Sequence, residues 1–137
     1  MIRKLSLLFF LVSYCAIGSR ACTNFLIGKN ASADGSTIVT YNMDSYGMYG
    51  KLPLFPAARH KAGEMRHVVD ADHNHYMGEI PEAPETYQVI GQINEHQLTI
   101  TETTFTGRKE LCEPNGIIDY VSLMTIGLQR ARTAREA

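Results

Sequence analysis

Short apolar runs alternate with polar turns along most of the chain, which is the pattern of a sheet built from short strands. Residues 23–27 form one apolar run and residues 36–41 form another, rich in β-branched side chains. Residues 28–35 lie between them and supply the Asn, Asp and Gly of a turn. This order predicts a β-hairpin, whose free end brings Cys22 close to residues 42–44.

Three further strands are expected downstream, at residues 65–69, 87–91 and 98–105. In the last of these segments apolar side chains alternate with threonines, which suits a strand that has one face on a core. Residues 72–84 contain two histidines and two prolines and are expected to form a loop, and residues 94–97 are expected to form a polar turn. The middle of the chain is therefore predicted to consist of strands joined by loops.

The last part of the chain has the periodicity of an amphipathic helix. From residue 117 onward apolar side chains recur at three- and four-residue spacing, after a Pro-Asn-Gly start at residues 114–116. The helical character is expected to continue to residue 137 without a stop signal, which indicates an N-terminal portion of a longer domain. Strands followed by a helix predict an α+β fold, with the helix packed on a mostly antiparallel sheet.

Residues 1–21 have the layout of a secretory signal. They begin with basic residues, continue with an apolar stretch, and end with small residues three and one positions before Cys22. The apolar stretch is shorter than the roughly 20 residues that a membrane-spanning helix needs, so a permanent membrane span is not expected. We expect cleavage after Ala21 and export to the periplasm or the extracellular space.

The processed chain, residues 22–137, has the size of one domain. It retains 116 of the 137 residues, and the loss of Arg3, Lys4 and Arg20 changes the formal net charge from −1 to −4. The charged side chains are scattered, without the basic stripe that binds phosphate groups. A nucleic-acid partner is therefore not expected.

Cys22 would become the N-terminal residue after this cleavage. It would then combine a thiol with a free α-amine, whose unperturbed pKa is about 7.7–8.0. A neutral amine can take the thiol proton as the sulfur attacks a carbonyl group and can return it to the departing amine. One residue could thus supply both the nucleophile and the general base.

Other interpretations of the same residues remain open. Cys22 and Cys112 are the two cysteines left after processing, and in an exported protein they could form a disulfide. Cys22 could instead carry lipid. His73 and His75 form a His-x-His pair, but a convincing metal site would need further ligands at supporting spacings, so no metal is expected.

Residues 22–37, CTNFLIGKNASADGST, resemble the start of the dipeptidases of peptidase family C69, which are N-terminal nucleophile hydrolases. Further segments resemble the family in the same order along the chain. They are NMDS at residues 42–45, GQINE at 91–95, TETT at 101–104, and the helix end at 128–137. The ordered set is more specific than any one segment.

The resemblance implies a four-layer αββα sandwich and hydrolysis of dipeptides without a metal or an organic cofactor. Cys22 matches the nucleophile that processing exposes. Asp44 matches the family aspartate that holds the terminal amine. Thr104 lies near the segment in which relatives present a backbone N–H group to the oxyanion, a contribution that is usually large in such reactions.

The resemblance also has limits. Choloylglycine hydrolases and penicillin V acylases, which are relatives of the family, carry an arginine at the position of Tyr41, so their chemistry is not expected here. Family members are several times longer, and their later strands and second oxyanion donor have no counterpart in this chain. The leading hypothesis is a dipeptidase. The alternatives are hydrolysis of another small amide, such as an N-acyl amino acid, and a non-catalytic exported module with Cys22 in a disulfide.

Overall fold

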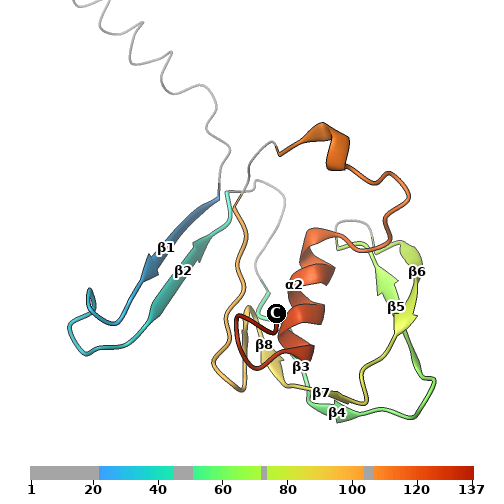
Figure 1. Ribbon diagram of the computed structural model, residues 1–137, viewed down its shortest axis with the longest axis horizontal. Coiled ribbons are helices and arrows are strands. Elements are labelled where there is room, and N and C mark those ends of the chain that lie inside the picture. Colours follow the sequence, from blue (N-terminus) through green and yellow to red (C-terminus); the bar gives the residue numbers. More distant parts are fainter. Residues whose placement is uncertain (1–21, 45–50, 72–73, 104–106) are drawn as a thin grey trace, which may run out of the picture.

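The computed structural model describes residues 22–44, 51–71, 74–103 and 107–137 (Figure 1). The expected signal at residues 1–21 and the candidate Thr104 lie outside the described residues. The described strands are β1 (Thr23–Ile27), β2 (Ile38–Asn42), β3 (Leu54–Phe55), β4 (Ala58–Arg59), β5 (Met65–Val69), β6 (Tyr76–Pro81), β7 (Glu85–Thr86), β8 (Val89–Ile90) and β9 (Ile93–Asn94). The described helices are a 3₁₀ turn, η1 (Lys109–Leu111), and an α-helix, α2 (Tyr120–Arg130).

Strands β1 and β2 form the predicted antiparallel hairpin. Thr23 pairs with Asn42 at the open end of the hairpin, and Ile27 pairs with Ile38 at its loop end. In the loop, Asp34 Oδ1 accepts hydrogen bonds from the Ser36 amide at 3.0 Å and the Ser36 hydroxyl at 2.6 Å. Figure 1 shows the hairpin standing beside the remaining sheets and the helix.

The other strands form three small antiparallel sheets, with the neighbour orders β3-β8-β9, β4-β7 and β5-β6. The strand expected at residues 65–69 is confirmed as β5. The loop expected at residues 72–84 is wrong, because β6 lies within it and pairs with β5 from Tyr76 to Pro81, with a register shift at Met77. Pairing satisfies the backbone of β5, and this requirement outweighs the local turn signals of the prolines and histidines.

Two expected strands are shorter than predicted or missing. Within residues 87–91 only Val89–Ile90 is a strand, and from residue 98 to residue 103 the described pairing is one bridge between Ile93 and Thr99. The apolar side chains of the latter segment pack in another way. Leu98 is buried in the core and Ile100 packs against the core. Burial of these two side chains explains why apolar and polar residues alternate here, although the segment is not paired as a β-strand.

Helix α2 is shorter than the sequence pattern suggested. It begins at Tyr120 because Asp119 caps it, with Asp119 Oδ1 accepting from the Ser122 amide at 2.6 Å. It ends at Arg130, and residues 131–137 are not helical. The expected continuation to residue 137 is therefore wrong.

Asn94 explains where the helix stops. Its buried Nδ2 donates to the carbonyl oxygens of Leu128 at 2.8 Å and Ala131 at 2.7 Å. Carbonyl groups at a helix C-terminus lack partners within the helix, and a side-chain donor from outside satisfies them here.

The core is small and lies between α2 and the strands β7, β8 and β9. Its buried apolar members are Val89, Leu98, Leu128 and Ala131. Among the described residues, small antiparallel sheets with one α-helix thus make an α+β fold, as the sequence predicted.

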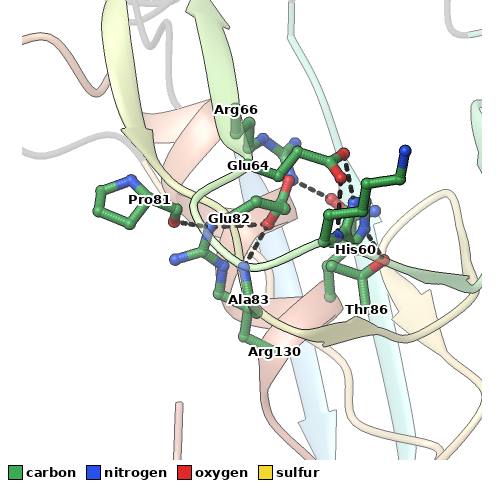
Figure 2. A network of polar contacts seen from close by, with 10 residues as sticks. His60, Glu64, Arg66, Pro81, Glu82, Ala83, Thr86 and Arg130 are labelled. Atoms are coloured by element: carbon green, nitrogen blue, oxygen red, sulfur yellow. Dashed lines mark hydrogen bonds and ion pairs between the residues drawn. The ribbon is translucent and has the colours of Figure 1, made fainter.

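A polar network ties α2 to the ends of β5 and β6 (Figure 2). The Glu82 side chain is only 8% exposed. Its carboxylate accepts a hydrogen bond from Arg130 Nη2 at 2.9 Å and lies 3.9 Å from Arg66 Nη1. Burial disfavours the Glu82 anion, but hydrogen bonds from Ala83 and Arg130 and the two guanidinium charges outweigh burial and hold its pKa below the usual range. Arg66 also donates to the side chain of Gln129 on the helix. These contacts fix the helix on the sheets.

Candidate active site

Cys22 is half-buried and directly precedes β1. The Thr103 hydroxyl donates to the Cys22 carbonyl oxygen at 2.9 Å. Side chains alternate along a strand, so Cys22 and Asn24 share one face of the hairpin with Tyr41, which pairs with Asn24. The expected proximity of Cys22 to the end of β2 is confirmed by this register.

Glu102 joins this face from a segment far along the chain. The Tyr41 hydroxyl donates to Glu102 Oε1 at 2.6 Å, and Asn24 Nδ2 donates to the Glu102 carbonyl oxygen at 2.6 Å. Together with the Thr103 bond, these contacts hold residues 101–103 against the open end of the hairpin. We call Cys22, Asn24, Tyr41, Glu102 and Thr103 the Cys22 cluster.

The Tyr41 hydroxyl is a neutral donor in this cluster. Burial raises its pKa well above the ordinary value, and the hydrogen bond to Glu102 and contact with the Cys22 side chain act in the same direction. Both neighbours can carry negative charge, which disfavours a phenolate beside them. Tyr41 therefore keeps its proton at neutral pH and links the thiol to the carboxylate.

Asp44, the aspartate matched from the sequence, lies at the end of the same hairpin and is exposed. Its Oδ1 accepts a hydrogen bond from Asn42 Nδ2 at 2.7 Å, which runs along the hairpin rather than toward Cys22. Asn42 lies next to Tyr41 in β2, so it points to the opposite face of the hairpin. The structure thus places Asp44 near the open end but outside the Cys22 cluster.

Sequence reasoning assigned no role to Asn24, Glu102 or Thr103. Strand alternation could have placed Asn24 beside Cys22, and the TETT segment had been matched to the family. The contact between this segment and the hairpin could not be predicted, because 78 positions separate Asn24 from Glu102.

Two other interpretations of the sequence were a disulfide between Cys22 and Cys112 and a metal site at His73 and His75. Cys112 is exposed and is not joined to Cys22 by a disulfide. His73 lies outside the described residues, and His75 Nδ1 is 3.9 Å from a carboxylate oxygen of Asp70.

None of the helices in the described ranges has the length and apolar character needed to cross a bilayer.

A groove of 880 Å³ lies at the other end of the hairpin from Cys22. It is lined by the loop end of the hairpin, around Ile38, and by Leu98 and Arg132. Size alone does not make it the candidate site, because Cys22 and its polar neighbours lie at the open end. The chemistry favours the Cys22 cluster.

Comparison with known proteins identifies the family of the chain. The chain is 29% identical over 106 residues to a protein from Salmonella dublin described as a probable dipeptidase; the match covers 66% of this chain but 24% of that protein. No solved structure matches the chain. The sequence profile of peptidase family C69 matches residues 21–54 and 54–137, and the chain therefore belongs to peptidase family C69.

Proposed function

We propose that this protein is a dipeptidase in which Cys22, exposed by removal of residues 1–21, is the nucleophile. The observation that carries the proposal is the position of Cys22 in a family C69 chain. It directly precedes β1, with Thr103 bonded to its carbonyl oxygen and Tyr41 against its side chain. The backbone of Cys22 is thus fixed by Thr103, and its half-buried thiol, which contacts Tyr41, is a suitable nucleophile.

Processing would supply the general base. In the 137-residue chain the nitrogen of Cys22 is a peptide nitrogen, which cannot accept a proton. Cleavage after Ala21 would convert it into an α-amine with a pKa of about 7.7–8.0. Its lone pair would be available near neutral pH, so processing would also activate the enzyme. A signal removed during export would place this activation outside the cytoplasm.

The reaction proceeds in two steps. The sulfur attacks the peptide carbonyl, its proton passes to the Cys22 amine and then to the departing amino group, and a thioester and a free amino acid result. Water then attacks the thioester with the amine again acting as base, which releases the second amino acid and restores the thiol. No metal or organic cofactor takes part in these steps.

Asp44 and Thr104 have supporting roles in the proposal. Asp44 lies at the open end of the hairpin, where a carboxylate could turn toward the new α-amine once residues 1–21 are removed. This would exchange its hydrogen bond to Asn42 for one to the amine. The backbone N–H of Thr104 is proposed to stabilise the oxyanion.

The fold of the complete protein is proposed to be an αββα sandwich. The hairpin and the small sheets beside α2 would be the first parts of its layers. The chain spans about a quarter of the length of the Salmonella relative. Activity should therefore be measured on the complete polypeptide.

The first experiment determines the N-terminal sequence and intact mass of the protein isolated from its source. We expect a mature chain that begins at Cys22. The second compares Cys22→Ser with Cys112→Ser on a panel of dipeptides and N-acyl amino acids. Cys22→Ser should lower kcat about 10³-fold or more, since it removes the nucleophile, whereas Cys112→Ser should have no effect. Unchanged turnover in Cys22→Ser would sink the proposal, and turnover of N-acyl amino acids alone would reassign the substrate.

A further inference from the structure

The groove at the loop end of the hairpin has a cationic lining. Its volume of 880 Å³ falls within the range of ligand-binding pockets. Lys29 lies on its hairpin side, and His96 and Arg132 line it from the rest of the molecule. None of the described residues that line the groove is Asp or Glu. The groove therefore favours an anionic ligand, although the chain as a whole has a formal net charge of −1.

Arg132 is held in place by Tyr87. Its Nε donates to the Tyr87 hydroxyl at 2.8 Å, and its guanidinium lies 5.3 Å from the centre of the Tyr87 ring. The His96 ring packs against the same ring in a T-shaped arrangement at 4.5 Å. Glu85 and Glu136 are near enough to favour the positive charge of Arg132, but neither lines the groove. The bond through Nε leaves the two Nη groups of Arg132 for a carboxylate, which guanidinium groups bind through paired hydrogen bonds.

The groove follows the outer edge of β2. Residues 36–39 all line it, whereas no residue of β1 does. Successive side chains of a strand point to opposite faces, so a groove lined by consecutive residues runs along the edge of the strand rather than over one face. β2 pairs with β1 on one side and has no partner on its other side among the described strands. Figure 1 shows that β2, not β1, faces the rest of the molecule. This edge offers backbone N–H and C=O groups to an added strand.

An extended peptide with a free C-terminal carboxylate matches both features. Its backbone can pair with the edge of β2, which is a common way in which proteins bind peptides, and its carboxylate can pair with Arg132. The apolar part of the lining suits the side chains of such a peptide and consists of Ile38, Val39, Ile93 and Leu98. Charge and backbone pairing thus indicate the same kind of ligand.

We propose that this groove is a peptide-binding site, in which an extended peptide adds to the edge of β2 and its C-terminal carboxylate pairs with Arg132, with Lys29 adding to the attraction. The site is separate from the Cys22 cluster. The five residues of β1 lie between them and span about 16 Å, at about 3.3 Å per residue. A dipeptide is about 7 Å long and does not reach from one site to the other. The inference therefore goes beyond the proposed dipeptidase activity.

The test measures binding of fluorescein-labelled Gly-Leu-Ile-Leu-Ala to the complete, processed polypeptide by fluorescence anisotropy. Cys22→Ser is the background, so that the peptide is not hydrolysed. We expect the free acid to bind and the C-terminal amide to bind about 10-fold more weakly, as for loss of a hydrogen bond to a charged group. Arg132→Gln should raise the Kd of the free acid about 10-fold and leave that of the amide within about twofold. Lys29→Gln should raise the Kd of the free acid about two- to fivefold.

Pairing with β2 is tested by methylating two successive peptide nitrogens, one of which must face the strand; this should abolish binding. Arg108→Gln is the matched control, because Arg108 is exposed, pairs with Glu110 and does not line the groove, and it should leave the Kd unchanged. Equal binding of the acid and the amide, equal binding of the methylated peptide, or an equal effect of Arg108→Gln and Arg132→Gln would overturn the inference. Absence of binding would overturn it too, since it would mean that another part of the complete polypeptide covers the edge of β2. Each of these results leaves the proposed function intact, because that function is measured by turnover.

Discussion

Asn94 is the side chain whose removal should weaken the described fold most clearly. It is 5% exposed and makes four hydrogen bonds. Its Nδ2 donates to the carbonyl oxygens of Leu128 and Ala131, and its Oδ1 accepts from the amides of His96 and Leu98, each at 3.0 Å. Asn94→Ala removes all four bonds and leaves four backbone groups without these partners.

The cost follows from these contacts. Each neutral hydrogen bond contributes about 0.5–1.5 kcal/mol, so four bonds correspond to about 4 kcal/mol. Water entering the space can satisfy some of the exposed groups, which lowers the expected loss to about 3 kcal/mol. This is a large part of the 5–15 kcal/mol or so that holds a typical domain together.

Urea unfolding followed by circular dichroism measures the global loss, and amide hydrogen exchange at residues 96 and 98 measures it locally. A loss of about 3 kcal/mol should speed exchange at these two amides about 100-fold. Asn115→Ala is the control, because Asn115 is exposed and the change should stay within about 0.5 kcal/mol. A loss below about 1 kcal/mol for Asn94→Ala would refute the assignment of Asn94 as the group that closes the helix end.

Three further predictions concern packing, charge and backbone conformation. Leu128→Ala, at a core position that is 1% exposed, should lower the free energy of unfolding by about 2–5 kcal/mol in urea titration, and a loss under about 1 kcal/mol would contradict its place in the core. Glu82 has a lowered pKa in the folded state, so its contribution is present above its unfolded pKa and is lost as the pH falls through the folded value. The difference in thermal stability between the parent and Glu82→Gln should therefore be larger at pH 6 than at pH 3, and a constant difference would argue against the ion pairs. Gly91→Ala should destabilise by about 1–2 kcal/mol in the same titration, because Gly91 has φ +58° and an added Cβ would lie 2.9 Å from Leu52 Cδ1; an unchanged midpoint would show that the turn relaxes.

The strands that the sequence predicted correctly are those whose signal is local. The hairpin of β1 and β2 combines two β-branched or apolar runs with a turn of Asn, Asp and Gly, and this local pattern is enough to predict it. β6 was missed because the histidines before it, together with Pro81 and Pro84, resemble a loop, and only pairing with β5 makes it a strand. Residues 98–103 were mistaken for a strand because a buried irregular segment can alternate in the same way.

The helix ends show the same division. Asp119 is a local cap that a close inspection of the sequence could have found, three positions before Ser122. The C-terminal end depends on Asn94, 34 and 37 positions away from the two carbonyl groups that it binds. Residues 131–137 keep a helical composition, but the helix stops where the distant Asn94 side chain donates hydrogen bonds to its last carbonyl groups.

By itself, the sequence determined that this chain resembles family C69, that Cys22 starts a hairpin, and that strands precede a helix. These features depend on the order of motifs and on local periodicity, which involve only residues close together in the sequence. Only the tertiary structure decided which groups surround Cys22. Glu102 and Thr103 reach it through hydrogen bonds that span 61 to 81 positions, and Asp44, the residue matched from the motif, lies outside that cluster. The physical reason is that such contacts depend on how separate elements satisfy each other's buried polar groups, which no local pattern records.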